Sequence, residues 1–153
     1  MISLLRTTSE HPDFMELVKH LDAYLAIIDG DEHSFYSQFN KIDMLKNVVI
    51  AYEDGEAVGC GAFKPFETDI VEMKRMFVKE EMRGKKIASR VLNELEQWAE
   101  ELGFQHYVLE TGVRQLAAIS LYQKLGYQII PNYGQYAGIE NSVCFEKRAI
   151  NSP

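Results

Sequence analysis

The feature that most constrains the fold is a change of hydrophobic period near residue 80. Before it, a strand-like segment runs from Ile70 to Val78, whereas after it apolar residues recur every three or four positions. The recurring apolar residues are Ile87, Val91, Leu95, Trp98 and Leu102. They predict a helix over residues 86–102 that ends at Gly103 and follows directly on a strand.

The rest of the chain alternates between strand and helix patterns. Asp54-Gly55 is typical of a tight hairpin turn, because such turns need positive φ values. Strands are expected at residues 2–6, 48–52, 57–63, 70–78, 106–110, 127–130 and 142–146, with helices at residues 12–30 and 115–125 and a short one at 35–39. This order predicts one α/β domain over residues 1–153, built on a mixed sheet.

Charge is distributed unevenly along the chain. Sixteen Lys and Arg against 23 Asp and Glu give a net charge of −7, which disfavours a nucleic-acid or anionic-membrane binder. Residues 74–90 nevertheless carry seven basic and two acidic side chains, which indicates one local anion site. The first residues do not resemble a secretory signal and no 18-residue apolar run occurs, so we expect a cytoplasmic protein without a membrane segment.

Neither the cysteines nor the acidic residues suggest a metal site. Cys60 and Cys144 stand in apolar strand-like segments without ligand-spaced partners, so buried free thiols are expected. One loop gathers four residues of metal-ligating type, Asp29, Asp31, Glu32 and His33. It lacks the glycine and the last glutamate of a calcium loop, so we interpret it as a solvated acidic loop.

The turn between the strand and the long helix suits a phosphate group. Residues 78–88, VKEEMRGKKIA, place Gly84 and several basic side chains directly before the helix. A helix start offers unpaired N–H groups and a partial positive charge, so a phosphate or pyrophosphate fits there. The alternative is an ordinary solvated helix start. The chain has neither a P-loop nor a Rossmann glycine motif.

Two motifs resemble those of the GNAT superfamily of acyl-CoA-dependent N-acetyltransferases. Residues 83–88, RGKKIA, resemble its Arg/Gln-x-x-Gly-x-Gly/Ala turn, with Lys86 in place of a glycine. Residues 115–122, QLAAISLY, followed by Gly126-Tyr127, resemble its Asn-x-x-Ala-x-x-x-Tyr helix, with Gln115 in place of Asn. The resemblance covers residues 46–148 and implies the mixed α/β fold of that family, with acetyl-CoA as acetyl donor and no metal.

The resemblance also implies where acetyl-CoA binds. It assigns the pyrophosphate to the backbone amides of Arg83, Gly84, Lys85, Lys86, Ile87 and Ala88. Met76, Phe77 and Val78 would pair with the pantetheine arm like an added strand, and Gln115 would also contact the cofactor. Core packing is the alternative for Met76 and Val78. A glycine at this position lets the backbone approach the pyrophosphate closely, because no side chain stands in the way. Lys86 does carry a side chain, which we expect to point outward.

Acetyl transfer to an amine requires a neutral nucleophile, but an alkyl amine with a pKa of about 10.4 is almost entirely protonated at pH 7. Glu72 stands where some members of the family keep a catalytic glutamate, so it is the candidate base. Lys74 follows two residues later on the same strand face. A structural Glu72–Lys74 ion pair is therefore the competing interpretation.

Tyr122 occupies the position of the family's tyrosine that reaches the sulfur of the departing coenzyme A. A tyrosine pKa of about 10 exceeds that of a thiol, about 8.5, so proton donation to a stable thiolate is uphill by about 2 kcal/mol. Orienting the sulfur is then its larger contribution, and core packing is the alternative role.

The expected activity is direct transfer of acetyl to a primary amine, either a small molecule or a peptidyl amine. Two loop regions, Phe35 and Tyr36 and then Tyr133, Tyr136 and Glu140, are candidates for the acceptor walls. One alternative is a non-catalytic acyl-CoA-binding regulatory module of the same fold, and another is an enzyme acting on tRNA-bound amines, which the net charge disfavours. A homodimer is left open, and the acceptor is not identified.

Overall fold

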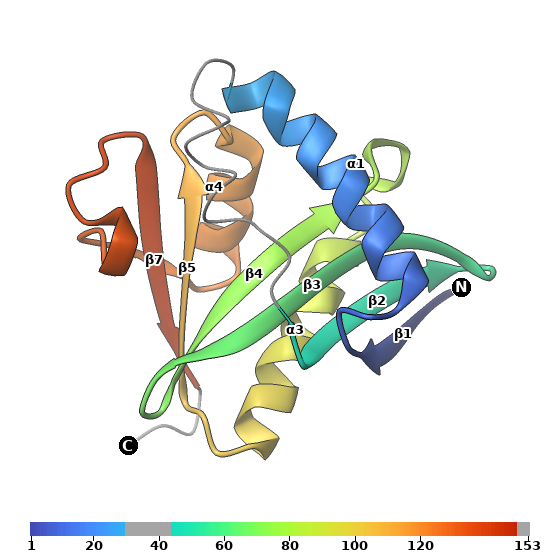
Figure 1. The fold of residues 1–153 in the computed structure, drawn as a ribbon, viewed down its shortest axis with the longest axis horizontal. Coiled ribbons are helices and arrows are strands. Elements are labelled where there is room, and N and C mark those ends of the chain that lie inside the picture. Colours follow the sequence, from blue (N-terminus) through green and yellow to red (C-terminus); the bar gives the residue numbers. More distant parts are fainter. Residues whose placement is uncertain (30–43, 150–153) are drawn as a thin grey trace.

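The computed structural model describes residues 1–29 and 44–149, which contain a seven-stranded sheet in the order β1-β2-β3-β4-β5-β7-β6 (Figure 1). The strands are β1 (Ile2–Thr7), β2 (Asn47–Glu53), β3 (Glu56–Glu67), β4 (Ile70–Val78), β5 (His106–Gly112), β6 (Gln128–Ile130) and β7 (Ser142–Arg148). The helices are α1 (Pro12–Asp29), α3 (Ile87–Glu101) and α4 (Leu116–Lys124). Only β4 and β5 pair in parallel, so the mixed sheet expected from the sequence is confirmed.

The helices cover both faces of the sheet (Figure 1). On one face, the apolar side of α1, including Phe14 and Leu17, packs against Val48, Ile50 and Phe77 of the sheet. On the other face, α3 and α4 build a second cluster around the sheet, which includes Leu92, Leu95, Tyr122, Tyr107 and Phe145. Strands β2 and β3 are thus buried on both sides along their middle residues, which accounts for their nearly continuous apolar stretches.

Two glycines of β3 allow α3 to lie close to the sheet. A Cβ atom at Gly61 would stand 2.9 Å from Leu95 and 3.0 Å from Val91, both on α3. A Cβ atom at Gly59 would meet Ile87, the first residue of the helix, at 3.1 Å. Because Gly59 and Gly61 lack side chains, α3 can lie close to β3.

The structure extends one strand beyond its expected end. The sequence predicts that the strand after the Asp54-Gly55 turn stops at Phe63, but β3 continues to Glu67 through Pro65. The pairing register shifts between Pro65 and Glu67, and such irregular positions tolerate a residue without an N–H group. The short helix expected at residues 35–39 lies outside the described residues.

A bulge bends β4 next to the parallel strand pair. Opposite Gly61 of β3, β4 places two residues, Arg75 and Met76, between the paired Lys74 and Phe77. Arg75 adopts a φ of 59°, in the left-handed region that a non-glycine residue rarely occupies. Bulges redirect a strand and its side chains. Here the bulge lies where β4 separates from β5.

Candidate active site

A gap opens between β4 and β5. The two strands pair only from Ile70 with His106 to Glu72 with Val108, whereas β4 continues to Val78 and β5 to Gly112. From the sequence, acetyl-CoA is expected in the gap between the strand that ends at Val78 and the strand that begins near His106, which are β4 and β5. The structure opens a gap between these two strands beyond Glu72 and Val108.

A cavity lies at this gap. Strands β4 and β5 supply most of its wall, α1 adds two leucines, and residues around α4 and the β6–β7 connection complete it. The lining residues are Leu21, Leu25, Glu72, Met73, Lys74, Arg75, Met76, Leu109, Glu110, Thr111, Gln115, Tyr122 and Tyr136. The sequence-predicted Glu72, Met76, Gln115 and Tyr122 therefore meet in one place.

The turn before α3 presents a run of unpaired amides. A short 3-10 helix, η2 (Glu80–Met82), follows β4, and Lys86 is the N-cap of α3 without a side-chain capping bond. The first backbone bond of α3 runs from the Arg90 amide to the Lys86 carbonyl, and within the described chain the amides of residues 84–89 donate to no backbone carbonyl. The Arg83 amide, which the resemblance assigns to the pyrophosphate, donates instead to the Glu80 carbonyl at 3.2 Å. Gly84 has a φ of 84° and Lys86 a φ of 63°. The turn therefore offers a concave set of donors suited to an anion.

The conformation of Lys86 explains why a glycine is common at this position. Its φ of 63° and ψ of 22° lie in the left-handed region, which costs an ordinary L-residue about 1–2 kcal/mol. The residue is exposed. That its side chain points away from the bound pyrophosphate stays a prediction.

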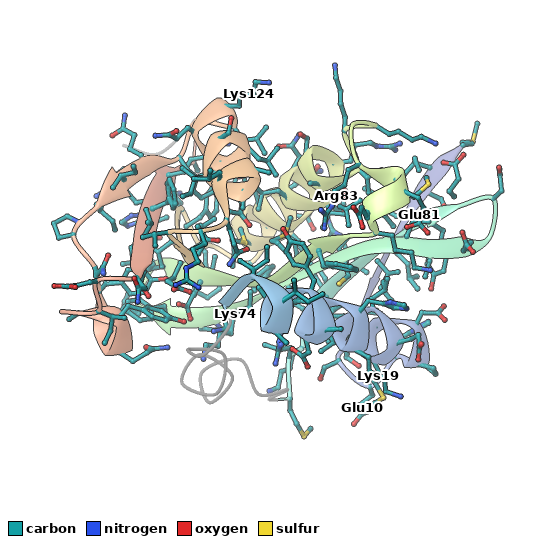
Figure 2. The ribbon with its side chains drawn as sticks, turned by 90° about the horizontal axis from the view of Figure 1, so that it is seen from above. Glu10, Lys19, Lys74, Glu81, Arg83 and Lys124 are labelled. Carbon is teal, nitrogen blue, oxygen red and sulfur yellow. The ribbon has the colours of Figure 1, made fainter. Side chains whose placement is uncertain are left out.

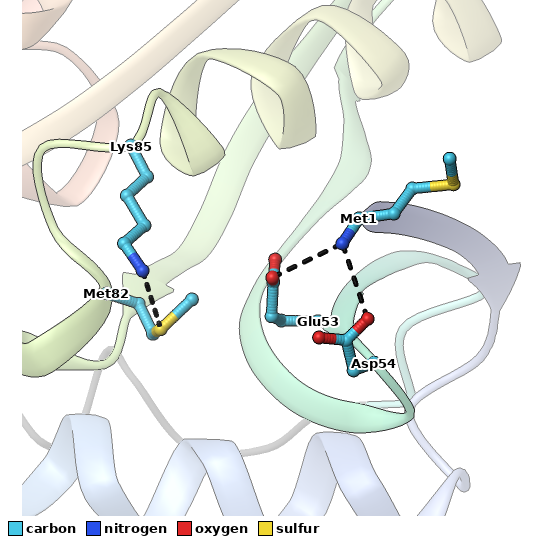
Figure 3. Close-up of polar contacts among 5 residues, drawn as sticks. All are labelled: Met1, Glu53, Asp54, Met82 and Lys85. Carbon is cyan, nitrogen blue, oxygen red and sulfur yellow. Dashed lines mark hydrogen bonds and ion pairs between the residues drawn. The ribbon is translucent and has the colours of Figure 1, made fainter.

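The side chains of the turn lie against neighbouring residues. Figure 2 labels Arg83 and Glu81 on the segment that leads into α3. The Arg83 guanidinium stacks 4.8 Å from the ring centre of Tyr24 on α1, and its Nε donates to the Val78 carbonyl at 3.2 Å. The Lys85 Nζ lies 3.9 Å from the Met82 sulfur (Figure 3). Both cations thus remain close to the amide run.

The three residues assigned to the pantetheine arm occupy different surroundings. The side chain of Met76 lines the cavity and contacts the α3 side of the sheet, whereas that of Phe77 is buried against α1. Val78 packs on the α3 side near the helix start. Within the described residues, the β5-facing edge of β4 beyond Glu72 has no strand partner, so this edge is available for an added extended chain.

Glu72 is buried and held by two partners. Its side chain is 2% exposed, its Oε1 lies 3.9 Å from the Lys74 ammonium, and its Oε2 accepts a 2.7 Å hydrogen bond from the Tyr133 hydroxyl. Burial lowers the pKa of Lys74, while the Glu72 charge opposes that effect. The ion pair considered from the sequence is thus present, and the same carboxylate also lines the cavity.

Tyr122 is 7% exposed and packs edge-on against Tyr127, with ring centres 6.0 Å apart. Burial and the nearby Glu110 charge raise its pKa well above the usual value of a phenol. Its hydroxyl makes no hydrogen bond within the described part of the chain, although the residue lines the cavity. The residue therefore belongs to the core and to the site, with a hydroxyl available to a ligand.

The helix that carries Tyr122 begins at the cavity. Gln115 is the N-cap of α4, its amide donates to the Gly112 carbonyl at 3.0 Å, and its side chain makes no capping bond. Three residues separate the end of β5 from the start of α4, and Tyr122, about two turns after Gln115, lines the cavity at the gap. This placement connects both ends of the second motif to one cavity.

The β6–β7 connection supplies an aromatic wall. Tyr136 lines the cavity, and Tyr133 contacts both Tyr136 and Phe66 edge-on. Glu140 is exposed and does not line the cavity. Phe35 and Tyr36 lie outside the described residues, as do Asp31, Glu32 and His33.

Sequence reasoning missed Glu110. It lies on β5, lines the cavity, and accepts a 2.7 Å hydrogen bond from the Ser142 hydroxyl. No motif marks it, because a single glutamate at a strand position usually faces solvent. Glu110 lies two residues after Val108, and Val108 pairs with Glu72. That Glu110 lies near Glu72 therefore follows only from the register of β4 and β5.

The cysteines are placed as expected. Cys60 and Cys144 are buried free thiols. Burial raises the pKa of Cys60 to about 12 and that of Cys144 to about 11, so neither is a thiolate at neutral pH. Within residues 1–29 and 44–149, no group of three or more His, Cys, Asp or Glu is arranged to hold a metal ion. No helix in this part of the chain is long and apolar enough to cross a membrane.

The sequence is similar to those of known acetyltransferases. The acetyltransferase (GNAT) family model matches residues 13–127. The chain is 31% identical over 150 residues to the IAA acetyltransferase of Azospirillum brasilense, with 95% of this chain and 97% of that protein covered. It spans about half the length of two further curated relatives, each called an uncharacterized N-acetyltransferase.

The fold is similar to solved structures of the same kind. A Klebsiella pneumoniae protein described as an acyl-CoA N-acyltransferase superposes with a TM-score of 0.82 at 29% identity, over 97% of both chains. A GNAT family acetyltransferase from Elizabethkingia anophelis, solved with acetyl-CoA bound, superposes with a TM-score of 0.67 at 18% identity, over 96% of this chain and 97% of that one.

Proposed function

The chain belongs to the acetyltransferase (GNAT) family of acetyl-CoA-dependent N-acetyltransferases, and on this premise we propose that it transfers acetyl directly to a primary amine in the cavity between β4 and β5. The observation that carries the proposal is that β4 links the gap to the turn before α3. The unpartnered edge of β4 and the Tyr122 hydroxyl, which makes no hydrogen bond in the described chain, lie at the gap, and the unpaired amides before α3 follow the end of β4.

Each of these features suits a different part of acetyl-CoA, in the order in which the parts follow one another along that molecule. The amides of residues 84–89, together with the Arg83 and Lys85 cations nearby, suit the pyrophosphate. The edge of β4 from Met76 to Val78 suits the amide groups of the pantetheine arm, which pair as an added strand does. Gln115, at the cavity wall, is the further cofactor contact. The bound donor supplies the activated acetyl group as a thioester.

The acceptor nitrogen attacks the thioester carbonyl, so a C–N bond forms while the C–S bond breaks and coenzyme A leaves. The nitrogen must lose a proton in this exchange, and we assign that proton to Glu72, directly or through water. Lys74 and Tyr133 hold the carboxylate in one position at the cavity wall. A fixed carboxylate beside the acceptor is what general base catalysis requires.

Tyr122 is assigned to the departing sulfur. Because its pKa is raised by burial, its hydroxyl is an even weaker acid than a free phenol and is a poor source of a proton for a stable thiolate. It retains its proton and donates a hydrogen bond to the sulfur, which stabilises developing negative charge. The raised pKa values of both buried thiols also favour direct transfer over a cysteine-bound acetyl group.

The same proposal covers the compartment and the assembly. Two buried cysteines without a disulfide suit the reducing cytoplasm, where we place the enzyme. The acceptor is a small-molecule or peptidyl amine rather than a nucleic acid, in keeping with the net charge of −7. The homodimer left open by the sequence is decided by light scattering at several protein concentrations.

The experiment is a thiol-release assay with acetyl-CoA across a panel of amines, followed by mass spectrometry of the products. Release of coenzyme A together with an amine product heavier by one acetyl group supports the proposal. Binding of acetyl-CoA without release by any amine in the panel contradicts catalysis and identifies the chain as an acyl-CoA-binding regulatory module. Salt-dependent RNA binding would instead favour a tRNA-bound acceptor.

A further inference from the structure

Tyr127 lies directly after the helix that carries Tyr122. The Tyr127 amide donates to the Tyr122 carbonyl at 2.9 Å. The Gly126 amide donates to the Gln123 carbonyl at 3.2 Å, and Gly126 has a φ of 96°. These two bonds form the Schellman motif that ends many helices, and a contact between the side chains of its first and last residues often accompanies it. The rings of Tyr122 and Tyr127 accordingly meet with their centres 6.0 Å apart.

The far end of the Tyr127 side chain is fixed on α3. Its hydroxyl donates a 2.8 Å hydrogen bond to Oε2 of Glu96, whose side chain is 10% exposed. Burial and the Glu96 charge raise the pKa of Tyr127 well above its usual value, so the hydroxyl keeps its proton and remains a donor at neutral pH. Tyr127 is thus held at two points, by its backbone at the end of α4 and by its hydroxyl on α3.

Lys147 of β7 binds the other carboxylate oxygen of Glu96. Its ammonium lies 3.0 Å from Oε1 of Glu96 and 5.6 Å from the ring centre of Tyr127. A largely buried ion pair is a weak source of net stability, because the lost hydration of both charges offsets their attraction. Charge-assisted bonds to both oxygens nevertheless fix the orientation of the carboxylate. The pair therefore determines where the Tyr127 hydroxyl lies.

The position of the Tyr122 hydroxyl depends on how its ring packs. The ring lies 6.0 Å from that of Tyr127 and 5.8 Å from that of Phe145, and the hydroxyl makes no hydrogen bond within residues 1–29 and 44–149. A shift of the Tyr127 ring would therefore be passed on to the Tyr122 hydroxyl. Displacing a reacting group by about 1 Å can lower a rate by up to about 10².

We propose that Glu96 and Tyr127 are positioning residues for acetyl transfer, which hold Tyr122 so that its hydroxyl meets the departing sulfur of coenzyme A. Neither Glu96 nor Tyr127 is among the described residues that line the cavity, so both act through Tyr122. Lys147 completes the arrangement by orienting Glu96. This inference rests on the proposed function, since it concerns the role assigned there to Tyr122.

The test is a double-mutant cycle that combines Tyr127→Phe with Tyr122→Phe. Tyr127→Phe keeps the ring but removes the bond to Glu96, so kcat should fall about fivefold, with the KM of the amine and the Kd of acetyl-CoA within about twofold. In the Tyr122→Phe background the same change should lower kcat less than about twofold, because no hydroxyl is left to position. Glu96→Leu removes the same hydrogen bond from the other side and should show the same dependence on Tyr122.

A merely structural role predicts a different outcome of this cycle. Tyr127→Phe would then lower kcat by the same factor in both backgrounds, or would lower the melting temperature with kcat unchanged in the folded protein. Either result overturns the inference while the proposed function stands.

Tyr107→Phe is the matched control, because Tyr107 is a second buried tyrosine whose hydroxyl bonds to α3, at the Glu100 carboxylate. Tyr107 does not line the cavity, and the ring contacts of Tyr122 in the described chain are with Tyr127 and Phe145. This variant should keep kcat within about twofold of the wild type. A loss as large as that in Tyr127→Phe would show that removing any hydroxyl from this core lowers turnover, and it would overturn the inference.

A binding measurement separates the inference from catalysis. Coenzyme A and its desulfo analogue differ by the thiol that Tyr122 is assigned to contact. Isothermal titration should show that the wild type binds coenzyme A at least about threefold more tightly than the analogue, and that Tyr127→Phe loses most of this difference, as Tyr122→Phe does. If no amine releases coenzyme A, the proposed function fails and this measurement alone decides the inference. A difference retained in Tyr127→Phe, or absent from the wild type, overturns it.

Discussion

The Tyr133 hydroxyl donates a 2.7 Å hydrogen bond to the Glu72 carboxylate, joining the β6–β7 connection to β4. The Tyr133 ring is held in turn between Phe66 and Tyr136, at centre distances of 5.1 and 5.7 Å. A hydrogen bond from a residue so constrained leaves the carboxylate little freedom. The site therefore presents a carboxylate in a fixed place.

The first prediction concerns Glu72. Replacing it with Gln keeps the shape but removes the proton acceptor, so kcat should fall by about 10²–10⁴. The pH dependence of kcat/KM should lose or shift its ascending limb, while the Kd of acetyl-CoA changes little. The measurement is a pH–rate profile with one good amine for both proteins.

Glu67→Gln is the control for that profile, because Glu67 is exposed at the end of β3. It should behave as the wild type. Superimposable profiles for the wild type and Glu72→Gln, with rates within a few-fold, would make Glu72 a structural partner of Lys74.

Tyr122 should matter moderately for turnover. If its raised pKa restricts it to hydrogen bonding, Tyr122→Phe should lower kcat less than a rate-limiting general acid would, by about tenfold rather than the 10²–10⁴ range. Steady-state kinetics at saturating acetyl-CoA supply the number. An unchanged kcat in a less stable variant would show that Tyr122 only packs in the core. A loss of kcat beyond about 10³-fold would show that Tyr122 donates a proton in the rate-limiting step.

The backbone of Lys86 should be strained in its left-handed conformation. Replacement by glycine should remove a conformational cost of about 1–2 kcal/mol, because glycine adopts the left-handed conformation without strain. The greater freedom of glycine in the unfolded chain offsets about 0.5–1 kcal/mol of this gain. Lys86→Gly should therefore be more stable than Lys86→Ala, which loses the same charge and keeps the strain. Urea unfolding of the two variants measures the difference. A lower stability for Lys86→Gly would refute the strained conformation.

Alkaline pH should destabilise the fold through tyrosines such as Tyr52. Burial, and then a hydrogen bond donated to Asp13, raises its pKa to about 12. The folded state thus holds a proton that the unfolded state releases near pH 10, so this stabilisation is complete below about pH 10 and is lost as pH rises toward 12. Melting temperatures of Tyr52→Phe should fall less steeply than those of the wild type over this window. Parallel curves would exclude a contribution from Tyr52.

Local patterns predicted much of the fold and of the cofactor turn. The apolar pattern from Ile87 to Leu102 is sufficient to predict α3, because the start and the apolar face of a helix depend on residues close together in the sequence. The resemblance to the family turn likewise identified Lys86 as unusual. The structure adds the physical reason, since the position has a positive φ.

The shape of the cavity depends on pairing between distant strands and escaped prediction. The separation of β4 from β5 beyond Glu72 accompanies a bulge at Arg75, and neither the bulge nor the register has a marker in the sequence. Glu110 was missed for the same reason, since its place at the cavity follows from the register of β5 against β4. Tyr133 was expected at the acceptor wall, but its bond to Glu72 joins residues 61 positions apart.

The central claim is that acetyl-CoA lies in the β4–β5 gap with its pyrophosphate at the turn before α3. Isothermal titration of acetyl-CoA into the wild type, Arg83→Glu and Lys19→Glu tests it, since Lys19 is an exposed residue of α1 that receives the same charge reversal. Melting curves establish that Arg83→Glu remains folded without its contact to Tyr24. We predict equal Kd values for the wild type and Lys19→Glu, and a Kd at least about tenfold higher for Arg83→Glu. The same Kd in all three folded proteins would contradict the assignment of the turn to the pyrophosphate.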